Sequence, residues 1–282
     1  MDNLEELQEE IFKFYNRDNK DNLDTWIDVF NLLDVFNLYF YNYTNHIKNK
    51  LNTDSEFNDV LQKSLGRILK TFNEILVLLK NGFPEGALAR WRTLYETIII
   101  IMLIIKSKNR ELMAKDYVDY QKKIDMKNLR KYIEISEIEG SSWEKVNIDK
   151  SLLEDEEKGV KDYSWSGFTT FAQIQNQVSP KDYKIHYSTA NWCIHSGNYK
   201  SLCLLEDSIG SSSLSSIRTK YWIDEVIGAT LEILMFFFNS LKDNLFKSED
   251  ILNEDYIVLL KVNNLIVDKI INIRKEVYDY GE

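Results

Sequence analysis

The chain has 282 residues, enough for one large domain or two small ones with a substantial hydrophobic core. Its formal net charge is −10, which argues against general binding to duplex DNA, because contacts to phosphates need a positive surface. With only two prolines and ten glycines, and with Leu, Ile, Lys and Glu throughout, the composition predicts long helices. The expected fold is therefore all-α.

The sequence has no segment typical of a membrane span or a signal peptide. Its longest apolar run, TIIIIMLII at 97–105, is nine residues long, whereas a helix needs about 20 to cross a bilayer. The N-terminus, MDNLEELQEE, is acidic and lacks the order of a signal peptide. Cys193 and Cys203 lie among apolar residues, as is typical of buried free thiols in a reducing compartment. We expect a cytoplasmic protein that makes no membrane contact.

Apolar residues recur every three or four positions through most of the chain, which predicts a series of amphipathic helices. Several ends are marked by a capping signature at Thr53–Glu56, a C-terminal signal at Asn81-Gly82 and Pro84 in a first turn. The expected helices cover approximately 2–16, 22–50, 53–81, 84–107, 108–137, 168–177, 180–197, 214–246 and 249–277.

Two segments lack this pattern. Residues 138–160 are polar and are expected to form a loop with a short helix. Residues 206–216, EDSIGSSSLSS, are expected to form a Gly/Ser loop that could close over a site. Neither resembles a linker between domains, so we expect a single all-helical domain over 1–282 with an N-terminal helical extension at 1–50.

The predicted helix at 84–107 combines charged side chains with the most apolar run of the chain. On a helical wheel Arg92 and Glu96 share one face, while both faces are apolar beyond residue 97. The helix is therefore expected to be central and buried on most sides. Buried charges are costly unless they are paired, so Arg92 and Glu96 are expected either to satisfy each other or to serve a pocket.

The predicted helix at 180–197 places Asn191 and His195 on one face, with Tyr187 at the edge of that face. His195 lies near the expected helix C-terminus, where the macrodipole favours the imidazolium, and a neighbouring carboxylate such as Glu96 would raise its pKa further. A histidine, an arginine and a carboxylate suffice for acid–base chemistry on a phosphodiester. His195 would move the proton, Arg92 would stabilise the developing charge, and Glu96 would orient the imidazole.

Other interpretations compete with this site. A Glu–Arg pair and a histidine also tie buried polar groups together in helical bundles, and composition alone favours that structural role. Tyr163 and Trp165, in KDYSWSG, could stack on a base, although such aromatic clusters more often belong to a core. The three histidines form no HxxE or ExxH pair, and neither a Gly-rich phosphate loop nor a GxSxG elbow occurs. We expect neither a metal nor another cofactor.

Three blocks of the sequence, LLKNGFPEGALARWRTLYET, KDYSWSG and YSTANWCIHSG, resemble in the same order those of the bacterial DUF5677 family, which is all-helical and has no assigned activity. The first block contains Arg90, Arg92 and Glu96. In the third, Tyr187 and His195 fit a Tyr-x3-Ser-x3-His pattern in which Asn191 replaces the serine. The resemblance covers roughly 60–245.

That family is associated with HEPN-like helical proteins, many of which are ribonucleases of toxin or phage-defence systems. The resemblance therefore implies a metal-independent endoribonuclease that acts on RNA. It is expected to form a homo-oligomer, with the site near a dimer interface. The sequence lacks the usual Arg-x4–6-His on one helix, so the site would be assembled across helices. The implied catalytic residues are His195, Arg92 and Glu96, and the implied substrate-binding residues are Arg90, Tyr187, Asn191, Trp165 and Tyr163.

Two alternatives stay open. The first is a non-catalytic helical scaffold, sensor or partner-binding subunit that acts with a protein from the same defence system. It predicts that His195, Arg92 and Glu96 are satisfied by internal hydrogen bonds. The second is a small-molecule pocket between helices, with Trp165, Tyr187 and Trp192 as walls.

Overall fold

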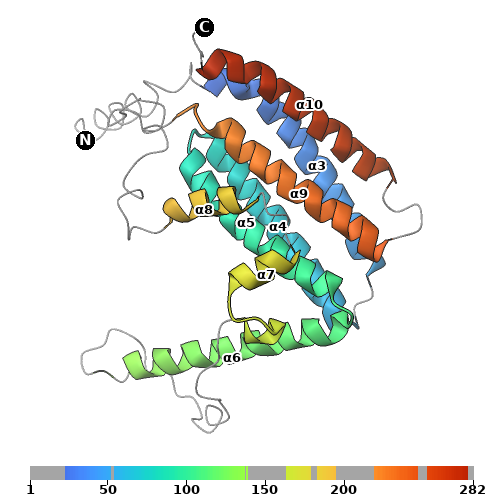
Figure 1. Ribbon diagram of the computed structural model, residues 1–282, viewed down its shortest axis with the longest axis vertical. Coiled ribbons are helices and arrows are strands. Elements are labelled where there is room, and N and C mark those ends of the chain that lie inside the picture. The colour runs from blue at the N-terminus through green and yellow to red at the C-terminus, as the bar shows by residue number, and fades with distance from the viewer. Residues whose placement is uncertain are drawn as a thin grey trace, which may run out of the picture. The chain divides into compact units, whose positions relative to one another are not determined.

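A computed structural model describes residues 23–51, 54–136, 138, 163–178, 183–194, 219–246 and 253–278. In these ranges every regular element is a helix and no strand occurs, which confirms the all-α fold (Figure 1). The predicted helix at 2–16, the loop at 206–216 and all but the first residue of the loop at 138–160 lie outside the described residues. None of the described helices combines the length and the apolar composition needed to cross a membrane.

The described helices follow the predicted order. A short 3-10 turn, η1, occupies Asp24–Trp26, and a second, η3, occupies Ser164–Ser166. The α-helices are α3 (Ile27–Lys50), α4 (Glu56–Lys80), α5 (Pro84–Lys106), α6 (Arg110–Ser136), α7 (Phe171–Val178), α8 (Tyr183–Trp192), α9 (Ile223–Leu245) and α10 (Asn253–Tyr278).

The predicted C-terminal end of α8 is wrong. The helix ends at Trp192 and not at Gly197, because Cys193 and Ile194 form a turn in which the Ile194 N–H donates to the Asn191 carbonyl. Cys is a weaker helix former than Leu or Ala, so this short helix gains little from extending beyond Trp192.

The predicted start of α9, near 214, is also wrong. Residues 219–222 are described and are not helical. The helix begins at Ile223, because Trp222 has a left-handed backbone with φ of 64°. Long-range hydrogen bonds hold the segment before it in place. The Thr219 N–H donates to the carbonyl of Gly82 (3.0 Å), and the indole N–H of Trp26 donates to the carbonyl of Lys220 (3.0 Å).

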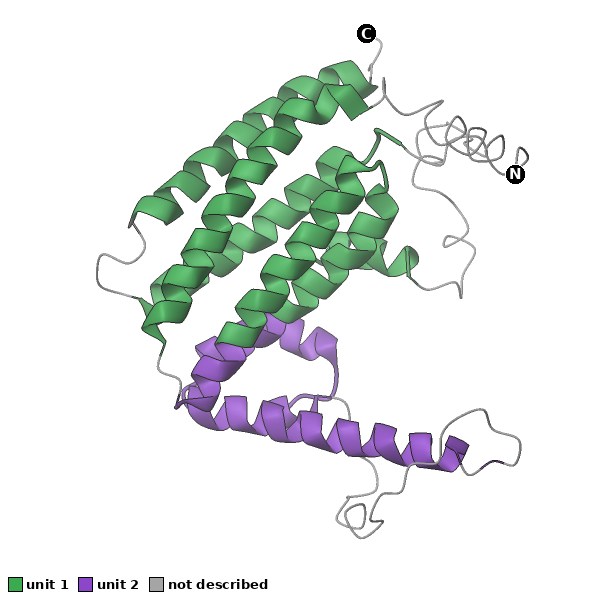
Figure 2. Ribbon diagram, turned by 180° about the vertical axis from the view of Figure 1, so that it is seen from behind, with its two compact units in different colours: residues 1–51, 62–98, 180–282 green, residues 52–61, 99–179 purple. Residues whose placement is uncertain are grey.

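The chain forms two compact units (Figure 2). Unit 1 comprises 1–51, 62–98 and 180–282, and unit 2 comprises 52–61 and 99–179. The boundary crosses α4 and α5, so each of these helices contributes to both units. The single domain over 1–282, with its extension over 1–50 and its core over 60–245, stays a prediction.

Helix α5 is buried along most of its length, as the sequence predicts. Trp91, Leu94 and Tyr95 are fully buried in its first half. From Ile98 to Ile105 every residue except Ile100 is buried. A helix that is apolar on all its faces has to be surrounded by other elements.

An aromatic cluster joins three helices in the core of unit 1. Phe40 of α3 packs edge-on against Phe238 of α9, with ring centroids 5.0 Å apart, and lies 5.9 Å from Phe72 of α4. All three side chains are fully buried, and burial of each stabilises the fold by about 1.5–3 kcal/mol. Helix α10 lies along α3 (Figure 1).

In unit 2, Glu111 of α6 caps the N-terminus of α4. Its carboxylate accepts hydrogen bonds from the Ser55 hydroxyl (2.7 Å) and from the backbone N–H groups of Glu56 (2.7 Å) and Phe57 (3.3 Å). Thr53, the first residue of the predicted capping signature, lies outside the described residues. A carboxylate is favoured at this position because it satisfies unpaired N–H groups and faces the positive end of the helix dipole.

We predict that Glu111→Gln lowers the melting temperature at neutral pH but not in acid. The Ser55 hydroxyl and the two backbone N–H groups hold the pKa of the Glu111 carboxyl below its usual value. The stabilisation is therefore fully present above the unfolded pKa of about 4.3 and is lost as the pH falls through the lower folded pKa. Thermal unfolding of both proteins between about pH 3 and pH 7 measures this, with Glu134→Gln on the exposed side of α6 as control. A difference in melting temperature between the wild type and Glu111→Gln that stays constant across this pH range would contradict the capping role.

Candidate functional site

Arg92 and Glu96 pair with each other on α5. The Nε atom of Arg92 lies 2.8 Å from Oε1 of Glu96. Tyr187 of α8 donates its hydroxyl to the same oxygen at 2.7 Å, and the Arg92 guanidinium carbon lies 5.3 Å from the centroid of its ring. The structure thus brings together three predicted site residues, and we call them the polar trio.

The polar trio is half-buried. The side chains of Arg92 and Glu96 keep 21% and 31% of their accessible surface. Burial raises the pKa of Tyr187, and the hydrogen bond to Glu96 raises it further. Burial alone would lower the pKa of Arg92, but the hydrogen bond and the negative charge of Glu96 raise it overall. Neither the phenol nor the guanidinium is therefore poised to exchange a proton near neutral pH.

Helix α8 packs on the first half of α5 in unit 1. Tyr187 packs against Tyr95, with ring centroids 5.4 Å apart. Cys193 follows the end of α8. Burial raises the pKa of its thiol to about 11, and the negative charge of Glu85, in the first turn of α5, contributes to this rise. Glu85 and Glu96 are about 16 Å apart along the helix axis, at about 1.5 Å per residue. Tyr187 lies beside Glu96, to which its hydroxyl donates a hydrogen bond.

The predicted catalytic histidine, His195, lies outside the described residues, and its approach to Arg92 and Glu96 stays a prediction. The described histidine of α8 is His186, whose ring lies edge-on to Trp91 at 6.0 Å between centroids. Among the described residues, no group of three or more His, Cys, Asp or Glu side chains is arranged to hold a metal ion.

Arg90 and Asn191 are not bonded to the polar trio within the described part of the chain. The Arg90 guanidinium pairs with Glu74 of α4, and its Nε atom is buried without a hydrogen-bond partner. The Oδ1 atom of Asn191 is also buried without a partner. Their predicted role in substrate binding stays a prediction.

Tyr163 and Trp165 belong to unit 2, where they pack against its helices. Trp165 is only 9% exposed, and its ring lies 4.7 Å from that of Tyr117 on α6. Tyr163 has a φ of 63°, and its ring lies 6.1 Å from that of Phe171 on α7. Stacking on a nucleic-acid base needs an open aromatic face, so this packing favours the core role considered for the KDYSWSG block.

A groove of about 640 Å³ lies between α8, α9 and α10 in unit 1, and the sequence did not predict it. On α9 and on α10 the lining residues recur every three or four positions, so each set forms one face of a helix. The main lining residues are Tyr183 and His186 on α8, Glu225, Gly228, Glu232, Phe236 and Asn239 on α9, and Asn263, Val267, Ile271 and Arg274 on α10.

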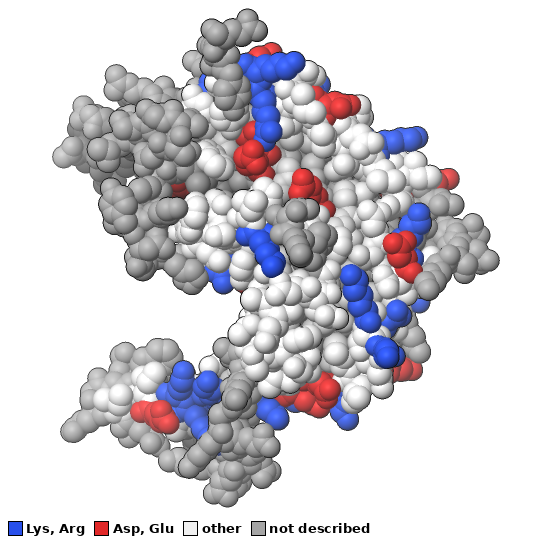
Figure 3. All heavy atoms as spheres, in the orientation of Figure 1, with Lys and Arg blue, Asp and Glu red and all other residues white. Residues whose placement is uncertain are grey.

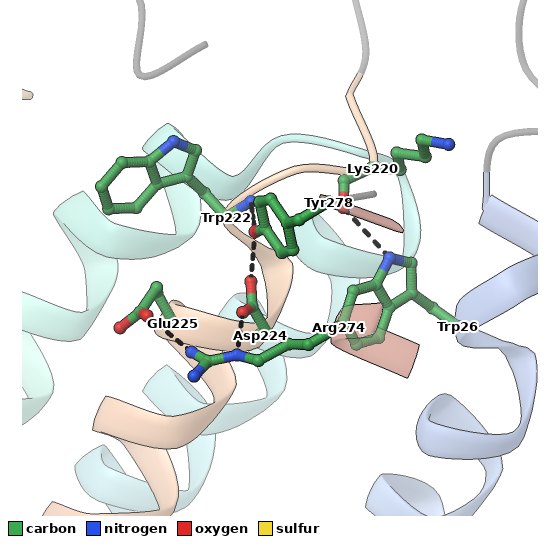
Figure 4. A network of polar contacts seen from close by, with 7 residues as sticks. All are labelled: Trp26, Lys220, Trp222, Asp224, Glu225, Arg274 and Tyr278. Atoms are coloured by element: carbon green, nitrogen blue, oxygen red, sulfur yellow. Dashed lines mark hydrogen bonds and ion pairs between the residues drawn. The ribbon is translucent and has the colours of Figure 1, made fainter. Parts of the chain in front are cut away.

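A polar network joins α9 to α10 at one end of this groove (Figure 4). Asp224, only 2% exposed, accepts hydrogen bonds from Nε of Arg274 (2.5 Å) and from the Tyr278 hydroxyl (2.6 Å). Nη2 of Arg274 also reaches Glu225 (2.5 Å), and the Trp222 N–H donates to the Tyr278 oxygen (3.0 Å). The buried carboxylate is thus fully paired, which is the condition for a buried charge to be tolerated.

We predict that Tyr187→Phe lowers the free energy of unfolding by about 1–2 kcal/mol, because it removes a hydrogen bond to the carboxylate of Glu96 and keeps the ring in place. Urea denaturation measures the loss. Tyr183→Phe on the same helix is the matched control, because its hydroxyl donates a longer bond, of 3.3 Å, to the uncharged carbonyl of Glu232. Equal losses in the two variants would contradict a specific role for the bond to Glu96.

Comparison with known proteins identifies the family. The chain matches the model of a family of unknown function, DUF5677, over residues 58–212, which is more than half of its length. The match includes the polar trio and α8 but ends before α9 and α10. No curated protein and no solved structure matches the chain. The chain therefore belongs to the DUF5677 family, as the three sequence blocks predict.

Proposed function

We propose that this protein is a non-catalytic helical subunit that recognises a partner. The observation that carries the proposal is the bonding of Glu96, whose Oε1 atom accepts hydrogen bonds from both Arg92 and Tyr187. One oxygen of the carboxylate that would orient a catalytic imidazole is thus already engaged. This bonding is what a polar pair with a structural role on a central helix shows.

The charge distribution favours a protein partner over RNA. The chain carries a net charge of −10. On the face drawn in Figure 3, Lys and Arg side chains are interspersed with Asp and Glu, and the described residues form no continuous basic stripe there. A protein that holds RNA by its backbone needs concentrated positive charge.

The setting of this proposal follows from the sequence and from the family resemblance. We place the protein in the cytoplasm, as a homo-oligomer in a bacterial phage-defence or toxin system. The HEPN-like association of the family supports that context, and the partner would be a protein from the same system.

A metal-independent ribonuclease is the second candidate, and one observation favours it. The side chains of Arg92 and Glu96 keep 21% and 31% of their accessible surface, so a phosphodiester could approach the guanidinium from solvent. In this candidate His195 moves the proton, Arg92 stabilises the developing charge, and Glu96 orients the imidazole.

A cleavage assay separates the two candidates. We predict that the purified wild type and His195→Ala both leave total bacterial RNA intact when no divalent cation is added, and that both are harmless when expressed in bacteria. Gel analysis of the RNA and growth curves measure these outcomes. Cleavage by the wild type that disappears in His195→Ala would replace the binding proposal with the ribonuclease, provided that both proteins have the same melting temperature.

A further inference from the structure

The groove of unit 1 is elongated. Its α9 side runs from Glu225 to Asn239, a length of about 21 Å at about 1.5 Å per residue. Its α10 side runs from Asn263 to Arg274. The two helices are antiparallel, since Arg274 bonds to Glu225 near one end and Tyr256 bonds to Asn239 at the other. This length matches a helix of about four turns better than it matches a compact small molecule.

Apolar side chains are exposed along this groove. Val267 and Ile271 of α10 are 41% and 52% exposed, and Phe236 of α9 is half-buried. Gly228 lies between the polar positions of α9, and a Cβ atom built there would meet no other atom within 4 Å. Another chain can therefore approach the α9 backbone closely at Gly228 and cover the apolar side chains.

The lining of the groove carries more negative than positive charge. It contains three carboxylates, those of Asp224, Glu225 and Glu232, against one guanidinium, that of Arg274. Arg274 already bonds to both Asp224 and Glu225. Glu232 is exposed and has no ion-pair partner among the described residues, and Asp243 adds an exposed carboxylate further along the same face of α9. An occupant therefore gains from Lys or Arg beside its apolar side chains.

We infer that this groove binds a basic amphipathic helix supplied by a partner protein. The apolar face of that helix covers Phe236, Val267 and Ile271, and a Lys or Arg at its border pairs with Glu232. A second copy of this chain would place one acidic lining against another, so charge disfavours it as the occupant. The inference rests on the proposed partner-binding function and names the class of partner.

Two glycines provide a matched pair of variants. Gly228→Phe places a ring in the groove, and the open space around its Cβ position allows the fold to accommodate the ring. Gly66→Phe makes the same change at an exposed position of α4, where a Cβ atom also meets nothing within 4 Å. Each variant replaces a helical glycine, so both changes favour the helix. Circular dichroism and melting temperature check that both variants are folded.

The probe is a fluorescent amphipathic peptide of leucine and lysine, about 14 residues long to match the groove. Its controls are a twin with glutamate in place of lysine and a peptide of the same composition in scrambled order. We expect fluorescence anisotropy to show binding of the basic peptide to the wild type and to Gly66→Phe. Gly228→Phe should weaken that binding by about tenfold or more. Glu232→Gln should weaken it severalfold and reduce its dependence on salt.

Several outcomes would overturn the inference. These are no binding to the wild type, equal binding to Gly228→Phe, and equal binding of the scrambled peptide, the last of which would indicate non-specific attraction to an acidic protein. A wild-type dimer that dissociates in Gly228→Phe, measured by sedimentation, would assign the groove to a second copy and would overturn it too. RNA cleavage that depends on His195 would instead contradict the proposed function, whatever the groove binds.

Discussion

The burial of α5 is the constraint on which the polar chemistry of unit 1 depends. A helix with apolar residues on every face leaves little surface for a charge, so Arg92 and Glu96 lie in its first half and bond to each other. Tyr187 completes the arrangement from a second helix. Helix α8 has only ten residues, too few to be stable alone in water, so it depends on its contacts with α5 and α9.

The packing of α10 explains why the groove exists. This helix packs more extensively on α3 than on α9. At the start of α9 it is held by Asp224, which bonds to Arg274 and Tyr278. Because these contacts fix α10 in place, the facing sides of α9 and α10 do not close on each other. The same network bonds to Trp222, whose backbone is left-handed, and α9 begins only after this residue.

Local physical chemistry explains which features could be predicted from the sequence. The apolar period and the caps predicted α3, α4, α5 and α10, and the spacing of Arg92 and Glu96 predicted their pairing. The C-terminal end of α8 and the start of α9 could not be predicted in this way. The start of α9 depends on hydrogen bonds from Thr219 and Trp26 to residues distant in the sequence, which no local pattern encodes. The groove could not be predicted for a related reason. Periodicity identifies the apolar face of one helix, but it does not show which face of another helix lies opposite.

In the sequence analysis, Tyr187 lay at the edge of the helix face that carries His195. The structure shows the contact that this position makes. Tyr187 bonds to Glu96, while His186, the next residue towards the N-terminus, lines the groove and contacts the fully buried Trp91. One short helix therefore has both an interior contact and a surface role. Because contacts with the interior hold α8 in place, this side of the groove loses little conformational freedom when a ligand binds, which favours affinity. The bonding of Glu96 and the open groove thus belong to one interpretation, in which the half-buried polar trio holds α8 in place and α8 forms part of the binding surface.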